Sequence, residues 1–591
     1  MRRILIVALV GAMVLTGVSA VEARRKDAKM LESEARKIVD EYVAKYMPLD
    51  LKLRRAWYKY GTTGDKRASN RQAKMELAIR TLNSDPERFA KLKELYGDRK
   101  RIRDDIIRRQ VEILYHRHLN NQVAPEKLKR LTRLEQRIQQ IFNDYRPEVD
   151  GKKLTPVEVS HILSDSTDSK RLEKVWKAHK AVGSLLERDY RQLVKLRNEI
   201  ARDLGYRDAV ELASVVSETD LKMLDRFYDD VHRYTEKPFR KLKEEYIDPR
   251  LAKRYGISTK DLRPWHYQNA FFQEAPTAIF GRVDLDDLYS KVDSKHVVGQ
   301  TIDFYGSMGV DIQGIIDNSS LYPKPGKNPH AVAWYLDPNK PGNAVLIMNL
   351  PRPPEHPKAS EASTLVHELA HDINYEAILQ NDEVPYLLRE PTMLTEAVAM
   401  LFEKQTLTDD WFVRLGVPAK KAQEVARAVE LIDYVDQLIF LRWSSVIYCF
   451  ERSFYADPDQ DIGQLWWSCK ARHQFLDRPE GWNQPDALAK YHIPNVTPLY
   501  YSNYAIGRVA NVQFAELLAK RINQPASQAS YFGQRQLGGW LMDDFLAQGE
   551  RYRWDEFLIK STGKPLSVKA WKRHYIDSDL GKRLFSAPPP L

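Results

Sequence analysis

Residues 360–376 read SEASTLVHELAHDINYE, a stretch without proline or glycine. With Ser360 in front as an N-cap, this composition predicts a helix that begins near that serine. The stretch contains HELAH at 367–371, an H-E-x-x-H pattern. On a helix of about 3.6 residues per turn, His367 and His371 lie on one face and can hold one metal ion. Glu368 lies about 100° around the helix from His367. It can therefore reach a water molecule beside the ion without binding the metal itself.

The third ligand has to come from elsewhere in the chain, because a catalytic zinc site needs three protein ligands and one open position. The metzincin pattern is excluded, since Asn374 and Ala377 stand where it needs glycine and histidine. Glu396 follows His371 by 25 residues, inside the apolar run 391–405. An unpaired carboxylate is costly in such a run, and metal binding would offset that cost. The alternative is an ion pair or a carboxylate that faces solvent.

This ligand set predicts one Zn²⁺ ion and metal-assisted hydrolysis. Zinc supplies Lewis acidity to water and to a carbonyl oxygen. Glu368 would act as general base, taking a proton from the water and passing it to the leaving amine.

The remaining sequence predicts a mainly α protein. Charged helices extend from about 24 to 215, and the predicted zinc-site region covers about 320–510. The β-prone runs HAVAWYL (330–336) and NAVLIMNL (343–350) flank DPNKPG and predict one small antiparallel sheet. We expect residues 21–591 to form a single helical domain.

Composition excludes several classes of protein. The 92 basic and 81 acidic residues leave a net charge of +11, a small excess that does not indicate nucleic-acid binding. No segment after the N-terminus is apolar enough to span a bilayer, so no stable membrane anchor is expected. The two cysteines, Cys449 and Cys469, exclude a cysteine zinc cluster. They could form a disulfide or remain two buried thiols.

Residues 1–20 read MRRILIVALVGAMVLTGVSA, which has the basic start, apolar stretch and small-residue end of a signal peptide. An uncleaved anchor is the alternative, but the apolar stretch of about 15 residues is shorter than the roughly 20 that a span needs. The sequence thus predicts export to the periplasm or the extracellular space.

Six motifs occur in an order and spacing that resemble the angiotensin-converting-enzyme family of peptidyl-dipeptidases and, more distantly, the thimet-type oligopeptidases. The likeness covers the chain from about residue 190 onward. The motifs are RNEIARDLGYRDAVEL (197–212), HAVAW (330–334), HELAH (367–371), TEAVA (395–399), LWWS (465–468) and AKYHIPNVTP (489–498).

The resemblance implies a gluzincin-type helical fold with two halves around a deep channel. It also implies His367, His371 and Glu396 as zinc ligands, with Glu368 as base. HAVAW is similar to the family's edge strand, where the backbone of Ala331 and Ala333 pairs with an extended peptide. His330 would face the substrate. Without the resemblance, HAVAW would be read as an ordinary buried strand.

The resemblance further implies a set of residues that bind short peptides. Lys490 would bind the substrate's C-terminal carboxylate, with Tyr501 and Gln268 assisting. His492 would hydrogen-bond the substrate backbone or the developing oxyanion, and Tyr504 would donate to the oxyanion. Read alone, a single lysine is more often solvated and a single histidine more often structural.

Three departures from the family pattern bear on activity. Asn503 stands where the animal enzymes have a chloride-binding arginine, so chloride activation is doubtful. Met400 replaces an aspartate that orients a ligand histidine, which must therefore find another partner. The 25-residue spacing from His371 to Glu396 equals that of the thimet-type enzymes.

The sequence therefore predicts an exported zinc metallopeptidase that releases C-terminal dipeptides from short peptides. A thimet-type endo-oligopeptidase and a non-catalytic peptide-binding protein of the same fold are the alternatives.

Overall fold

The computed structural model describes residues 2–280, 284–526 and 529–586, with side chains for 28–280, 284–526 and 529–585. It is mainly helical, as the sequence predicts. The helices of the first third are α1 (Arg2–Thr63), α2 (Lys66–Asn83), α3 (Pro86–Gly97), α4 (Asp105–Leu119), α5 (Pro125–Asp144), α6 (Pro156–Asp165), α7 (Ser169–Lys180), α8 (Val182–Asp203) and α9 (Ala209–Val216).

The middle of the chain forms α10 (Leu221–Lys241), α11 (Asp248–Tyr255), α12 (Leu285–Tyr289), α13 (Ser294–Ser307), α14 (Gln313–Asn318), α15 (Ala359–Gln380), α16 (Thr395–Glu403), α17 (Asp409–Arg414) and α18 (Ala419–Ala456). The last part forms α19 (Ile462–Gln474), α20 (His492–Asn495), α21 (Ser502–Arg521), α22 (Arg535–Trp540), α23 (Trp554–Thr562), α24 (Val568–Tyr575) and α25 (Asp579–Ser586).

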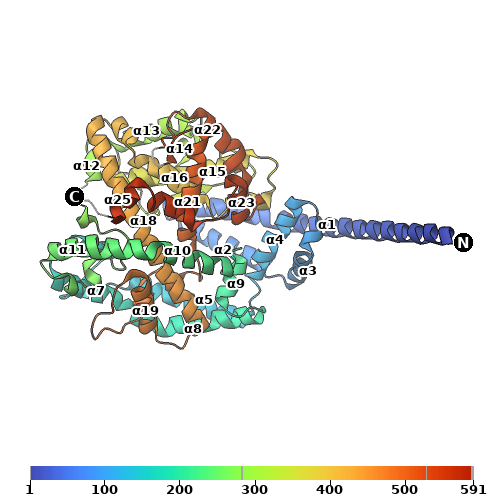
Figure 1. Ribbon diagram of the computed structural model, residues 1–591, viewed down its shortest axis with the longest axis horizontal. Helices are drawn as coiled ribbons and strands as arrows, with labels where there is room; N and C mark the ends of the chain where they lie inside the picture. Colours follow the sequence, from blue (N-terminus) through green and yellow to red (C-terminus); the bar gives the residue numbers. More distant parts are fainter. Residues whose placement is uncertain (1, 281–283, 527–528, 587–591) are drawn as a thin grey trace.

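Figure 1 shows the helices in two halves. The upper half contains α13 to α16 with α22, and the lower half contains α5, α7, α8 and α19. Helix α18 contacts α8 and α19 in the lower half and also α17 and α21. One long helix therefore joins the two halves. A channel between them remains a prediction.

The N-terminal part of α1 extends away from the rest of the chain (Figure 1), and the helix then packs against α2 and α4. The predicted signal peptide, residues 1–20, lies outside the residues whose side chains are described, so it stays a prediction. Among the described residues, no helix combines the length and the apolarity that crossing a membrane requires.

The predicted hairpin is present but shorter than its sequence pattern. Strand β3 (Val332–Tyr335) pairs antiparallel with β4 (Ala344–Ile347), with Ala333 opposite Leu346. A second two-stranded sheet, β1 (Glu148–Val149) with β2 (Lys152–Lys153), was not predicted. Asp150 and Gly151 in its turn both have positive φ, 52° and 79°. An Asp-Gly turn is a hairpin signal that could have located this sheet.

Helix α15 is the predicted metal helix, and it is anchored in the core. Leu365, Val366 and Leu369 are fully buried, and the helix contacts α16, β3 and β4. It begins at Ala359, and Ser360 lies inside the first turn rather than at the N-cap. The Glu361 carboxylate accepts the Lys358 amide at 2.8 Å instead, which satisfies one of the free N–H groups at the helix start.

The two cysteines form a disulfide. It joins Cys449 on α18 to Cys469 on α19, with the two Cα atoms 6.0 Å apart. Of the two readings that the sequence left open, the structure selects this one.

Candidate metal centre

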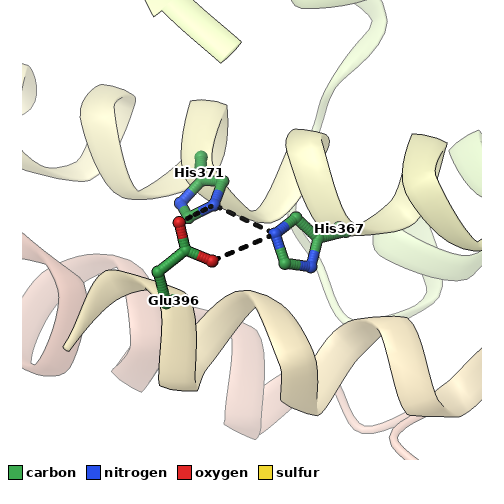
Figure 2. Close-up of side chains that lie close together, drawn as sticks. All are labelled: His367, His371 and Glu396. Atoms are coloured by element: carbon green, nitrogen blue, oxygen red, sulfur yellow. Dashed lines mark hydrogen bonds and ion pairs between the residues drawn. The ribbon is translucent and has the colours of Figure 1, made fainter. Parts of the chain in front are cut away.

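The two histidines of α15 direct their Nε2 atoms toward one point (Figure 2). The Nε2 atoms of His367 and His371 lie 3.3 Å apart. This proximity follows from the one-turn spacing of the two residues on one helix face.

Glu396 comes from the first turn of α16, which packs against α15. Its carboxylate oxygens lie 3.4 Å from His367 Nε2 and 3.8 Å from His371 Nε2. The three ligand atoms all fall within 4.8 Å of one another. Two atoms that are each about 2.0–2.1 Å from one tetrahedral ion lie about 3.3–3.4 Å apart. The donor set therefore fits zinc, and the structure brings the three predicted ligands together.

Glu396 lies beside the two histidines, as predicted. The argument that led to it, the cost of an unpaired carboxylate in an apolar run, was wrong. Its side chain is 50% exposed and is not sealed in an apolar core. The apolar neighbours Ala397, Val398 and Leu401 on the same helix are buried, whereas Glu396 is not. The cost of burying a carboxylate therefore does not decide its role; its proximity to two imidazoles does.

The electrostatics of the site favour a cation. Burial opposes the charged form of His367, but the Glu396 and Glu403 carboxylates outweigh this effect and raise the pKa of His367 to about 10. The hydrogen bond from His367 lowers the pKa of Glu396. Burial lowers the pKa of His371 to about 4, which keeps that ring neutral and able to bind a metal.

Each histidine is oriented through its second nitrogen. His367 Nδ1 donates to Glu403 Oε2 at 2.9 Å, and His371 Nδ1 donates to Thr395 Oγ1 at 2.9 Å. Thr395 in turn donates to Asn374 Oδ1 at 3.2 Å. These contacts direct each Nδ1–H at its partner and each Nε2 at the metal position. His371 is neutral and ready to bind, whereas His367 has to lose its Nε2 proton when a metal binds.

Because Met400 replaces the family's orienting aspartate, a ligand histidine was expected to need another partner. Glu403 is that partner for His367, and the sequence analysis did not predict it. It follows Glu396 by seven residues, two helical turns on the same face of α16. That spacing is the signal that could have found it.

Glu368 lies beside the edge of β3. Its Oε2 accepts the Ala333 amide at 2.8 Å. Burial raises the pKa of Glu368, as suits a general base that works near neutral pH. The Ala333 amide points away from β4, so the edge of β3 faces the metal helix. Ala331 precedes this strand and is partly buried, while His330 is exposed and its amide donates to Asn328 Oδ1 at 3.0 Å.

Three predicted aromatic residues gather at the start of α21. The His492 ring lies 5.1 Å from Tyr501 and 5.8 Å from Tyr504, measured between ring centroids. Burial and Tyr500 raise the pKa of Tyr504, with a further contribution from the Glu396 charge, so this phenol keeps its proton close to the metal ligands. Burial lowers the pKa of His492 to about 4, so its ring is neutral.

Lys490 lies beside this cluster. Its Nζ is 5.4 Å from the centroid of Tyr501 and donates to Gln273 Oε1 at 2.6 Å. Burial lowers the pKa of Lys490 to about 8, although the Glu274 charge acts in the opposite direction.

Gln268, predicted to lie beside Lys490, does not do so. Its Nε2 donates to Ser164 O and its Oε1 accepts the Ala278 amide at 2.9 Å. Its own φ is 57°, so it forms part of a tight loop. Both ends of the Gln268 amide are therefore already hydrogen-bonded, one of them to a residue on α6, and Gln273 contacts Lys490 instead.

The turn that presents the tyrosines is held by two charged residues that the sequence reasoning missed. Leu499 has a φ of 70°, and its amide donates to Glu451 Oε2 at 2.9 Å. Arg197 donates to Val496 O at 3.1 Å. Left-handed backbone is unfavourable for leucine, so this conformation needs outside support. We call residues 496–504 the tyrosine turn.

Comparison with known proteins supports a family assignment. The family model described as angiotensin-converting enzyme matches residues 29–266 and 355–575. The angiotensin-converting enzymes of Bos taurus and Rattus norvegicus are each 22% identical to the chain, and each match covers 69% of this chain and 32% of the relative. The chain thus spans about a third of the length of these curated relatives. The matched ranges cover most of the sequence, including α15, α16 and the tyrosine turn, and the chain therefore belongs to the angiotensin-converting-enzyme family of metallopeptidases.

Proposed function

We propose that this metallopeptidase is a zinc-dependent peptidyl-dipeptidase, which releases dipeptides from the C-termini of short peptides. The observation that carries the proposal is the convergence of His367, His371 and Glu396, with Glu368 on the same helix as the two histidines. The family is zinc-dependent, and the donor set and its spacing suit that ion.

The three ligands would hold the ion, and Glu403 and Thr395 would keep the two imidazoles in place. When bound, zinc supplies Lewis acidity that activates water and polarises the scissile carbonyl.

Glu368 moves the proton. It accepts a proton from the attacking water as the water oxygen bonds to the carbonyl carbon. The carboxylic acid then gives that proton to the leaving nitrogen as the C–N bond breaks. Its burial supports this role, because a raised pKa makes the carboxylate a stronger base.

Tyr504 and His492 act on the oxygen that becomes negative. Both rings are neutral at pH 7, so both can donate a hydrogen bond there. His492 Nδ1 is buried and has no hydrogen-bond partner among the described residues. Donors that are already oriented stabilise a developing oxyanion at little reorganisation cost.

The edge of β3 would bind the substrate backbone. Ala333 lies next to Glu368, and its outward amide is the group that an added strand would use. Ala331 would supply a second backbone contact, and the exposed His330 would face the peptide. A peptide that is bound through hydrogen bonds to its extended backbone gains affinity with little dependence on its sequence.

Lys490 would bind the substrate's free C-terminus, assisted by Gln273 and Tyr501. The partly buried ammonium, which has no carboxylate within hydrogen-bonding distance among the described residues, supports this role. A cation in this position selects peptides with a free carboxylate, the requirement of a peptidase that works from the C-terminus.

The product pattern tests the proposal. The zinc-loaded enzyme is given a decapeptide with either a free or an amidated C-terminus, and the products are identified by mass. Dipeptide release from the free form alone is expected. Internal cleavage of both forms at equal rates would instead indicate a thimet-type endo-oligopeptidase. Binding without cleavage would indicate a non-catalytic relative.

A further inference from the structure

An exposed glutamate, Glu274, lies next to the lysine that would bind the substrate's carboxylate. Lys490 Nζ donates to Gln273 Oε1 at 2.6 Å, and Gln273 Nε2 donates to Glu274 Oε1 at 2.8 Å. The Gln273 amide therefore bridges the ammonium and the carboxylate, with its oxygen on the cation and its NH₂ group on the anion.

The charge of Glu274 acts on both groups that the proposed function assigns to the free C-terminus. Burial lowers the pKa of Lys490, and the Glu274 charge opposes this shift. Burial raises the pKa of Tyr501 to about 12, and the Glu274 charge acts in the same direction. A ligand that pairs with Lys490 would therefore lie within the field of Glu274.

The loop that carries Glu274 is held from both sides. Lys470 on α19 donates to Phe271 O at 2.7 Å, and the Asp436 carboxylate on α18 accepts the Ala275 amide at 3.1 Å. Contacts to two helices therefore fix the backbone that presents Glu274 beside Lys490.

Glu274 is the carboxylate without an ion-pair partner in these surroundings. It is exposed, and no lysine or arginine among the described residues forms an ion pair with it. Asp436 is paired with Arg508 at 2.9 Å. Two buried lysines, Lys180 and Lys470, also contact the loop, but burial lowers the pKa of both and so reduces the positive charge that could offset Glu274. An unpaired anion next to a site for a carboxylate favours a ligand that supplies its own cation.

We propose that Glu274 selects lysine or arginine as the C-terminal residue of the peptide, an inference that rests on the proposed function. Such a residue has two opposite charges. Its α-carboxylate would pair with Lys490, and its flexible side chain would extend past Gln273 to Glu274. A neutral C-terminal residue leaves Glu274 to repel the bound carboxylate, because nothing else neutralises the glutamate. The enzyme would then favour the release of dipeptides that end in a basic residue.

Two hexapeptides that differ only in their last residue test this assignment. One ends in lysine and the other in Nε-acetyllysine, which has a similar length but no charge. A second pair has these two residues at the first position and ends in alanine, so that a general attraction of cationic peptides is detected.

Three variants accompany the peptides. Glu274→Gln removes the charge and keeps an oxygen that can accept from Gln273. Glu274→Lys reverses the charge. Glu424→Gln, an exposed change on α18, is the matched control.

The wild type is expected to show a KM about fivefold lower for the peptide that ends in lysine, the factor for a strong exposed ion pair. Glu274→Gln should make the two KM values equal, Glu274→Lys should invert their order, and Glu424→Gln should keep the wild-type ratio. Equal KM values in the wild type, a lysine preference that persists in both Glu274 variants, or an equal preference at the first position would overturn the proposal.

Binding to the Glu368→Gln enzyme separates this inference from the proposed function. Calorimetry with this variant measures peptide affinity while cleavage is blocked. Tighter binding of the peptide that ends in lysine, lost when Glu274→Gln is added, supports the assignment even if the wild type hydrolyses neither peptide, and then only the peptidase proposal fails. Dipeptide release from both hexapeptides with equal KM supports the peptidase proposal and refutes selection by Glu274.

Discussion

The amide of Ala333 donates to Glu368 Oε2 at 2.8 Å, which ties the edge of β3 to the proposed base. The strand and the helix thus share one hydrogen bond at the place where a peptide would enter. A substrate that pairs with β3 would compete for this amide. Binding the peptide would then release the carboxylate from its one backbone partner.

Glu368→Gln is expected to lower kcat by about 10²–10⁴-fold, because a glutamine cannot remove a proton from water. The amide oxygen can still accept from Ala333, so the thermal midpoint and zinc content should stay at wild-type values. Full peptide hydrolysis by a zinc-loaded Glu368→Gln enzyme would rule out the proposed base.

Glu403→Gln is expected to weaken zinc binding about 10–100-fold, because His367 loses its charged partner. Competition with a chromogenic chelator measures the affinity. Glu424→Gln, an exposed change of the same charge on α18, is the control and should bind zinc as wild type does. An unchanged zinc affinity in Glu403→Gln would show that the contact does not orient the ligand.

The pH dependence of KM should reflect the loss of the Lys490 charge. Burial lowers the pKa of this ammonium to about 8, so it loses its charge as pH rises above that value. KM for a peptide with a free C-terminus should therefore increase between pH 7 and pH 9.5. Lys490→Arg should keep KM flat over this range, because arginine stays protonated. A parallel increase for the amidated peptide would show that the carboxylate is not bound here.

The Cys449–Cys469 disulfide should contribute about 3 kcal/mol to stability, judged from the length of the loop that it closes. Reductant is expected to lower the thermal midpoint of the wild type. The double variant Cys449→Ser/Cys469→Ser should show the same lower midpoint with and without reductant. A midpoint that reductant leaves unchanged in the wild type would contradict a stabilising role.

Glu451 is expected to affect kcat indirectly, because its carboxylate holds the backbone of the tyrosine turn at Leu499. Glu451→Leu leaves the Leu499 amide without its acceptor, so Tyr504 should shift. We expect kcat to fall by about 10–100-fold, less than the roughly 10²–10³-fold that complete loss of an oxyanion donor costs. Glu451→Gln keeps an acceptor oxygen and should restore most of the activity. Zinc content and KM are the controls, since a general loss of folded protein would reduce zinc content as well. Equal kcat values for the leucine and glutamine variants would refute this role.

The sequence predicted the parts of the site that follow a local rule. HELAH on an unbroken helix places two histidines on one face, and the hairpin pattern located β3 and β4. The sequence did not predict contacts between segments far apart in the chain, because the packing of those segments decides which residues meet. Gln268 and Gln273 are five residues apart in one irregular loop, and no periodicity tells which amide meets Lys490. Glu451 and Leu499 lie on separate elements, and their contact has no sequence pattern.

The sequence by itself determined the helical fold class, the pair of histidines with their adjacent carboxylate, and the family motifs, because helical period and motif spacing are properties of the local chain. Only the tertiary structure decided that Glu403 and Thr395 orient the ligands, that Glu396 is half-exposed beside them, and that Gln273 contacts Lys490. Those features depend on how α15, α16, α18 and α21 pack, and packing is set by many small contacts that no single stretch of sequence encodes.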